Sequence, residues 1–219
     1  MDHAAPAAHA AAPPGTENPF SGVDNKKLGM WLFLGSDAMG FTGLLGAYAV
    51  LRLSAAAHWQ EVVRDGKPEF INMEVSRNWT FFNTFLLICS SVTMVLALKN
   101  LRLGNMGKFK GWLAATMLGG MGFLSIQAYE WPHLIHEGIT APSSLFGGTF
   151  FILTGYHGFH VLGGVVLLGW ALVRAMKGTY TQKNSIGIEV VGLYWHFVDL
   201  IWILLFTVIY LLPGKGGPS

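Results

Sequence analysis

Residues 145–173, LFGGTFFILTGYHGFHVLGGVVLLGWALV, decide the fold of this chain. The stretch contains no Lys, Arg, Asp or Glu. At about 1.5 Å of rise per residue, a helix of this length can cross a hydrocarbon core of about 30 Å. A stretch this long and this apolar therefore predicts a transmembrane helix.

Four further apolar stretches predict four more spans, at residues 28–51, 79–98, 111–129 and 189–212. Of the 219 residues, 52% are hydrophobic and 12% are charged, whereas a soluble domain carries about 25% charged residues. This composition argues against a soluble enzyme, and a net charge of +2 does not suggest a nucleic-acid partner. The single cysteine, Cys89, excludes an internal disulfide. We therefore predict an all-α polytopic membrane protein with five transmembrane helices.

The spans divide the chain into three parts. Residues 1–27, rich in Ala and Pro, are expected to form a disordered tail, residues 28–212 the membrane domain, and residues 213–219 a short C-terminal tail. Nine Lys and Arg residues would lie on the side of the N-terminus and five on the other side. The positive-inside rule therefore predicts a cytoplasmic N-terminus and an outer C-terminus. On the first span, Ser36, Gly40, Gly43 and Ala47 form a stripe of small residues that predicts close packing of another helix.

Five ionisable residues fall well inside the predicted spans: Asp37, His157, His160, His196 and Asp199. Such residues are unexpected there, because a charge at mid-bilayer costs about 2.5–3.5 kcal/mol even on lenient scales. His157 and His160 share one face of their helix, and Arg174, a near-integral number of turns beyond His160, lies on the same face at its cytoplasmic end. His196 and Asp199 share a face of the last span, and Glu130 lies near the outer end of the third.

Spacing alone leaves three interpretations of these residues open. The side chains can hydrogen-bond across helices and hold the bundle together. The histidines can instead bind haem or a metal, since imidazole is a common ligand, or they can line a proton path. For Asp37 the alternatives are a protonated carboxyl paired with Ser36 or with a neighbouring helix, or a proton-handling or lipid-contacting carboxyl.

Four segments resemble subunit III of the haem-copper respiratory oxidases, best known from cytochrome c oxidase: 194–202 (YWHFVDLIW), 148–161 (GTFFILTGYHGFHV), 127–131 (QAYEW) and 83–87 (NTFLL). The resemblance covers roughly residues 26–212 and is to the bacterial five-helix form. It implies a bundle with a lipid-filled cleft that packs on subunit I. Haem and copper would then lie in subunits I and II, with no cofactor in this chain besides structural phospholipid.

The resemblance also implies roles for particular residues. Asp37, where most mitochondrial members have glutamate, together with His160 and Arg174 would contact bound phospholipid. Glu130, His157, His196 and Asp199 match family positions and would form a structural polar network. No catalytic or metal-binding residue is expected in this chain.

The function implied is that of a non-catalytic accessory subunit of a proton-translocating terminal oxidase in aerobic electron transport. The complex would reside in the bacterial inner membrane, alone or within a larger respiratory supercomplex. The resemblance leaves the electron donor open, because quinol oxidases share this subunit type. A different hypothesis is a self-contained b-type cytochrome with His157, His160 and His196 as ligands. A transporter is a third, although five unequal spans do not offer two inverted halves.

Overall fold

The computed structural model describes residues 24–55, 61–64, 67–70, 74–136, 138–142, 144–182 and 184–211. Its elements are α1 (Asn25–Ser54), β1 (Glu61–Arg64), β2 (Lys67–Phe70), α2 (Glu74–Arg102), α3 (Met106–His136), α4 (Leu145–Met176), α5 (Ile186–Phe206) and the π-helical turn η1 (Thr207–Leu211). The helical fold is as predicted, and the hydrophobic spans coincide with the five long helices. The predicted tails lie outside the described residues, except for residues 24–27, of which residues 25–27 already belong to α1.

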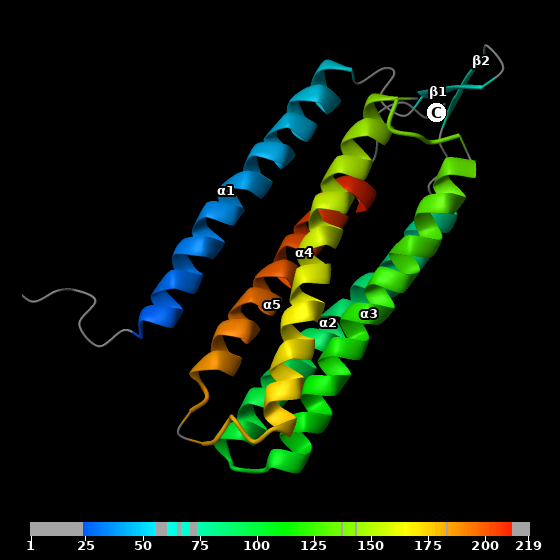
Figure 1. The fold of residues 1–219 in the computed structure, drawn as a ribbon. Helices are drawn as coiled ribbons and strands as arrows, with labels where there is room; N and C mark the ends of the chain where they lie inside the picture. Colours follow the sequence, from blue (N-terminus) through cyan, green and yellow to red (C-terminus); the bar gives the residue numbers. More distant parts are fainter. Residues whose placement is uncertain are drawn as a thin grey trace, which may run out of the picture.

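A small hairpin lies in the segment between α1 and α2, where the sequence predicted no membrane span. Strands β1 and β2 are antiparallel, with Glu61 opposite Phe70 and Arg64 opposite Lys67 (Figure 1). The hairpin lies beyond the ends of the helices, so it does not alter the arrangement of the bundle.

Local signals at the helix ends explain where the helices begin and stop. The Asp24 carboxylate accepts a hydrogen bond from the Lys26 backbone N–H at the start of α1, and Ser144 Oγ accepts one from the Gly147 N–H at the start of α4. Side-chain acceptors of this kind satisfy the free N–H groups of a first turn. Gly104 and Gly178, with φ of 76° and 74°, follow the ends of α2 and α4. Glycine tolerates this left-handed conformation, which stops a helix.

Helices α2, α3, α4 and α5 form a four-helix bundle, and α1 packs on its outside against α5 and α4 (Figure 1). The bundle core includes Trp195, whose fully buried ring lies over Gly120 and Gly164. In contrast, α1 buries a narrow seam of Leu34, Phe41 and Tyr48, spaced by seven residues.

The predicted small-residue stripe on α1 is not its packing face within this chain. Ser36, Gly43 and Ala47 are exposed, and a Cβ at Gly43 would meet no other residue. The large side chains of the seam hold α1 against the bundle instead. Gly40 is the member of the stripe that approaches another helix, through the Tyr156 hydroxyl.

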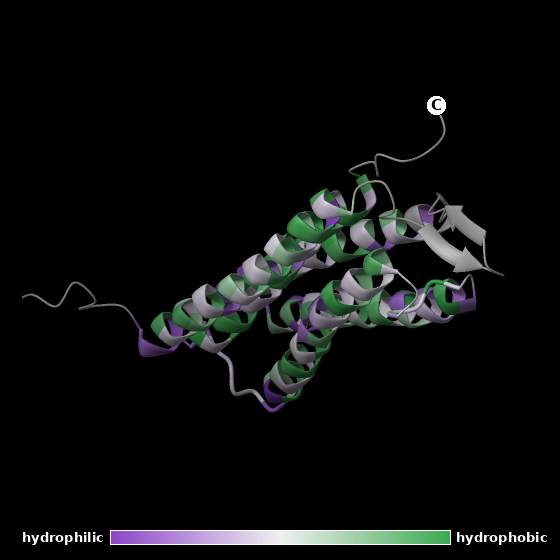
Figure 2. Ribbon diagram, turned by 90° about the horizontal axis from the view of Figure 1, so that it is seen from above, coloured by the Kyte–Doolittle hydropathy of each residue, from purple (hydrophilic) through white to green (hydrophobic). Residues whose placement is uncertain are grey.

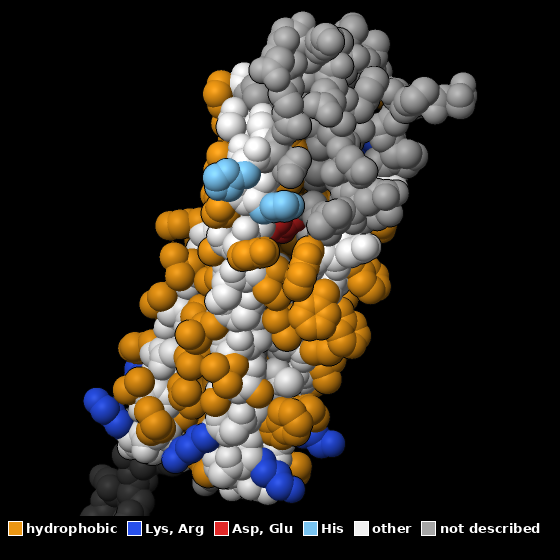
Figure 3. All heavy atoms as spheres, turned by 90° about the vertical axis from the view of Figure 1, so that its right-hand side faces the viewer, with side chains coloured by type: hydrophobic (Ala, Val, Ile, Leu, Met, Phe, Trp, Pro, Cys, Tyr) orange, Lys and Arg blue, Asp and Glu red, His pale blue; other side chains and the backbone are white. Residues whose placement is uncertain are grey.

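The exterior of the bundle is that of a membrane protein. Helices α1, α2, α4 and α5 with η1 are long and apolar enough to span a bilayer; α3 does not meet the same criterion. Apolar residues run along the helices (Figure 2), and the visible Lys and Arg side chains gather mainly at the end where α1 begins (Figure 3).

Candidate functional site: polar groups buried between the helices

Asp37 on α1 meets two side chains of α4. Its Oδ1 atom accepts a hydrogen bond from the Tyr156 hydroxyl at 3.1 Å and lies 3.1 Å from His160 Nε2. His160 Nδ1 is 2.7 Å from the backbone carbonyl of Tyr156, so Nδ1 must carry a proton to donate to it. The contact between Nε2 and Oδ1 then needs one further proton, held by the imidazole or by the carboxyl. Asp37 and His160 therefore form a pair that shares a proton between α1 and α4.

This pair brings together two of the three residues predicted to contact phospholipid. The ring of Phe41 on α1 packs against the rings of Tyr156 and His160 on α4, with distances between ring centroids of 4.8 Å and 5.3 Å. Tyr156 appeared in the quoted sequence motif, but nothing in the sequence indicated that its hydroxyl bonds to Asp37. That bond depends on how α1 is rotated against α4.

Arg174, the third predicted lipid residue, lies apart from this pair. It is exposed near the end of α4, and its guanidinium lies 4.8 Å from the centre of the Trp170 ring. It follows His160 by fourteen residues, or about 21 Å along a helix. The three residues thus share one side of the molecule at two different depths.

An apolar groove lies between these depths. It has a volume of about 610 Å³ and is lined by Met30, Phe33, Phe159, Leu162, Gly163, Val166, Leu167 and Tyr194. Trp170 and Arg174 continue the spacing of Val166 by four and eight residues, so they lie on the same face of α4, toward its C-terminal end. The Tyr194 hydroxyl donates to the backbone carbonyl of His160 at 3.0 Å, which links the groove wall to the Asp37–His160 pair.

Two of the four residues predicted to form a structural network do hydrogen-bond between helices. The buried Glu130 carboxylate of α3 accepts from Thr80 Oγ1 of α2 at 2.8 Å and from the Tyr210 hydroxyl of η1 at 3.3 Å. His196 Nδ1 of α5 lies 2.6 Å from Ser91 Oγ of α2. These contacts tie α2 to α3 and to α5.

The other two residues make no hydrogen bond to any described residue. Both ring nitrogens of His157 and both carboxyl oxygens of Asp199 are buried without a partner in the described part of the chain. His157 makes aromatic contacts instead: it stacks on Trp202 at 4.8 Å and meets the edge of Phe123 at 5.7 Å. The hydrogen bonds expected of His157 and Asp199 are therefore absent among the described residues.

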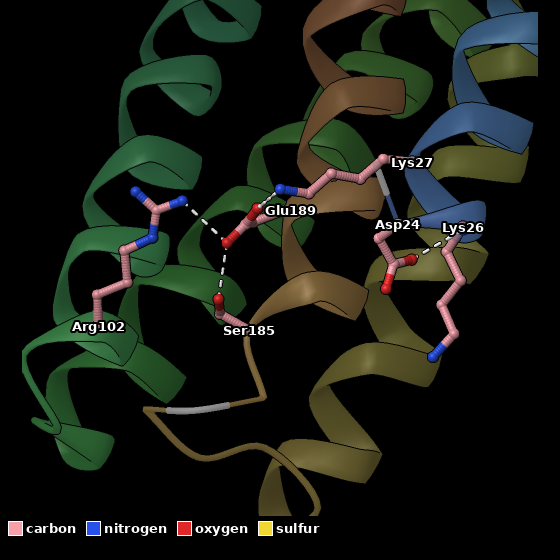
Figure 4. A network of polar contacts seen from close by, with 6 residues as sticks. All are labelled: Asp24, Lys26, Lys27, Arg102, Ser185 and Glu189. Carbon is pink, nitrogen blue, oxygen red and sulfur yellow. Dashed lines mark hydrogen bonds and ion pairs between the residues drawn. The ribbon is translucent and has the colours of Figure 1, made fainter. Parts of the chain in front are cut away.

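A cluster of charged side chains surrounds Glu189 at the end of the bundle where α1 and α5 begin. The sequence did not predict this cluster. Glu189, in the first turn of α5, receives Lys27 of α1 at 2.5 Å, Arg102 of α2 at 2.9 Å and the Ser185 hydroxyl at 2.7 Å (Figure 4). Lys26 points away from Glu189 (Figure 4). The sequence predicted that Lys and Arg gather on the side of the N-terminus, but not which cation reaches the glutamate.

The three intramembrane histidines do not converge on a common point. His160 faces Asp37, His157 faces Trp202 and His196 faces Ser91. Within the described ranges, no group of three or more His, Cys, Asp or Glu side chains is placed to hold a metal ion. This arrangement offers no support for the self-contained cytochrome.

Comparison with known proteins agrees with the motifs. The family model described as cytochrome c oxidase subunit III matches residues 16–213. The chain is 37% identical over 193 residues to cytochrome c oxidase subunit 3 of Bacillus subtilis (strain 168), covering 88% of each chain. It is 35% identical to cytochrome c oxidase subunit 3 of Bacillus sp. (strain PS3), again over 88% of each. It is also 35% identical to quinol oxidase subunit 3 of Bacillus subtilis, over 87% of this chain and 88% of the relative. The chain belongs to the cytochrome c oxidase subunit III family.

Proposed function

We propose that this chain is a non-catalytic accessory subunit of a terminal oxidase, that it packs on subunit I, and that it binds phospholipid which sustains oxygen reduction and proton pumping. Haem and copper would be held by subunits I and II. Family membership supports the subunit role. The observation that carries the lipid role is the apolar groove whose α4 face continues to Trp170 and Arg174.

The groove and Arg174 together suit a phospholipid. The groove is almost entirely apolar and can accept acyl chains, while a guanidinium at the membrane surface can bind a phosphate group through two parallel hydrogen bonds. Trp170 beneath the guanidinium supports its position through a cation–π contact. At the deeper end, the proton shared by Asp37 and His160 lets these two side chains pair with each other instead of facing the acyl chains unpaired.

We further propose that α3 is the fifth transmembrane span, with the N-terminus of the chain in the cytoplasm. Helix α3 has 31 residues and packs between α2 and α4, both of which are long and apolar enough to cross the membrane. The polar residues Gln127 and Glu130 lower the mean hydropathy of α3. Both are buried inside the bundle, so α3 can cross the membrane without exposing them to lipid. The count of nine Lys and Arg residues on the side of the N-terminus against five on the other side supports the orientation, and the inner membrane of a bacterium is the expected location.

Substitution of Arg174 tests the lipid role. In the purified oxidase, Arg174→Ala should lower the phospholipid content and shorten the time for which the enzyme stays active under turnover, with little loss of initial rate. Lys177→Ala is the matched control, because Lys177 is an exposed cation at the same helix end. If lipid content and lifetime are the same in both variants and in the unmodified complex, the lipid role is wrong.

The electron donor is inferred to be cytochrome c, with quinol as the second candidate because a quinol oxidase subunit is 35% identical. The copper ligands and the haem spectrum of the co-purified complex distinguish the two. A subunit II that contains copper supports cytochrome c, and one without copper supports quinol.

A further inference from the structure

One strip of α5 lies between the two helices that flank it, α1 and α2. Glu189, Leu193, His196 and Leu200 recur at intervals of three or four residues and therefore share this face of the helix. Helix α5 packs against both α1 and α2 (Figure 1). The polar groups on the strip differ in how fully they are paired.

At the N-terminal end of the strip, side chains of this chain pair with the Glu189 carboxylate. Lys27 reaches Glu189 from α1 and Arg102 reaches it from α2, so both flanking helices contribute a cation to the same carboxylate (Figure 4). The glutamate at this end therefore needs no partner from another protein.

In the middle of the strip, His196 has a hydrogen-bond partner among the residues that the structure describes for only one of its two ring nitrogens. His196 Nδ1 pairs with Ser91 Oγ at 2.6 Å, but no hydrogen bond joins Nε2 to any described residue. The His196 ring is partly exposed, and Leu200, one turn further along, is 65% exposed. Asp199 beside it is buried, and neither of its oxygens has a partner in the described part of the chain. Unpaired polar groups thus collect at one height on α5.

That height is close to the middle of the membrane. His196 is ten residues beyond the first residue of α5, or about 15 Å along the axis, half of a hydrocarbon core of about 30 Å. Acyl chains carry no donor or acceptor, and the bilayer core has no water to replace one. A ring nitrogen left open at this depth therefore favours a neighbour that can hydrogen-bond.

We propose that the strip of α5 from Leu193 to Leu204 docks a transmembrane helix of a neighbouring oxidase subunit, which presents a polar side chain to His196 Nε2. The proposal rests on the proposed function, because it assumes that the chain assembles with other membrane subunits. Leu200, Ile203 and Leu204 are exposed beside the histidine and supply apolar contact for the docked helix. Ser91 acts as a positioning residue, because its bond to Nδ1 directs Nε2 outward.

A photo-crosslinking amino acid at Leu200 tests which molecule lies on the strip in the intact complex. The matched control site is Val166, which is 64% exposed but lines the groove assigned to lipid. We expect the probe at Leu200 to link this chain to another oxidase subunit and the probe at Val166 to label lipid. If Leu200 labels only lipid, or only a second copy of this chain, in a preparation that contains haem, the docking proposal is wrong and the subunit role survives. If no haem co-purifies with the unmodified chain, both proposals are overturned.

Two amide substitutions at His196 separate its two nitrogens. A glutamine amide reaches about as far as Nε2, whereas an asparagine amide reaches about as far as Nδ1 and keeps only the contact with Ser91. We expect His196→Asn and His196→Leu to dissociate from the solubilised complex about three- to twentyfold faster than the unmodified chain, the range given by intramembrane hydrogen bonds. His196→Gln should dissociate at nearly the original rate. Equal rates for all three variants would overturn the proposal. If the variants do not assemble, the crosslinking result at Leu200, obtained with His196 in place, decides.

Discussion

Replacing Glu189 should loosen the N-terminal end of α1. In the variant Glu189→Gln, Lys27 and Arg102 lose the carboxylate that now joins them, so the electrostatic link from α1 through α5 to α2 is broken. Helix α1 depends on such links more than the other helices do, because it buries only the narrow seam of Leu34, Phe41 and Tyr48.

The size of the effect follows from the exposure of the three side chains. Arg102 is 58% exposed, which places its pair with Glu189 in the range of surface ion pairs, about 0.2–1 kcal/mol. Lys27 is 36% exposed and Glu189 only 13%, so their pair belongs near the upper end of the same range. A negative charge in the first turn of α5 adds about 0.3–1 kcal/mol through the helix dipole. Together, these terms predict that Glu189→Gln lowers the free energy of unfolding by about 1.5–3 kcal/mol.

A double-mutant cycle measures the link directly. The free energy of unfolding of the full chain is determined by detergent titration in bicelles for Lys27→Gln, for Glu189→Gln and for the double variant, and we expect a coupling of about 0.5–1 kcal/mol. Lys26→Gln is the control, because Lys26 points away from Glu189 and should show no coupling (Figure 4). High salt should reduce the Lys27 coupling, since the lysine is partly exposed. Additive effects of Lys27→Gln and Glu189→Gln at low salt would refute the reasoning.

Three further changes have defined expectations. Gly164→Ala should destabilise the chain by about 1–3 kcal/mol in the same titration, because the new methyl group would lie 2.7 Å from Cζ3 of the buried Trp195 ring. Thr80→Val should cost about 0.6–2 kcal/mol, because it removes the hydroxyl that donates to Glu130 between α2 and α3. Burial raises the pKa of the Tyr180 phenol in the loop between α4 and α5, although the charge of nearby Arg174 opposes the shift. The folded chain therefore keeps this proton at a pH where the unfolded chain releases it, and stability should fall as pH rises above about 10. Tyr180→Phe should leave stability unchanged at pH 7 and remove part of that alkaline loss, as measured by Tm between pH 7 and 11.

Matched controls keep these expectations specific. Gly43→Ala adds the same methyl group to α1 at a position where it meets no other residue, so it should not destabilise the chain. Thr42→Val removes an exposed hydroxyl that bonds only within its own helix, to Ala38, and should cost less than Thr80→Val. If Gly43→Ala is as harmful as Gly164→Ala, or Thr42→Val as harmful as Thr80→Val, the contacts named above do not explain the losses. A Tyr180→Phe variant with an unchanged alkaline profile would contradict the burial argument.

Much of the architecture follows from the sequence because it depends on neighbouring residues alone. The length of each apolar stretch is a local signal, and it predicts a helix without reference to the rest of the chain. The caps at Asp24 and Ser144 and the stop at Gly178 are local too, although we recognised them only in the structure. The placement of Arg174 on the same helix face as His160 is equally local, since it follows from the helical period.

The contacts between helices did not follow from such signals. The small-residue stripe on α1 indicated a packing face, yet the seam that contains Phe41 packs instead. Tyr156 rather than Ser36 bonds to Asp37, Lys27 rather than Lys26 reaches Glu189, and His157 meets an aromatic ring where a hydrogen bond was expected.

Hydrophobicity along the chain indicates which segments can enter the membrane, because each segment exchanges water for lipid largely independently of the others. For α3, which is less apolar than the other long helices, the proposal of a fifth span rests on its packing as well. The rotation of each helix about its axis depends on every neighbour at once, through the fit of large side chains such as Trp195 over Gly164. The sequence by itself therefore determined the helices and the polar residues they carry into the membrane. Only the tertiary structure decided which of those residues are paired and that His196 keeps one nitrogen open.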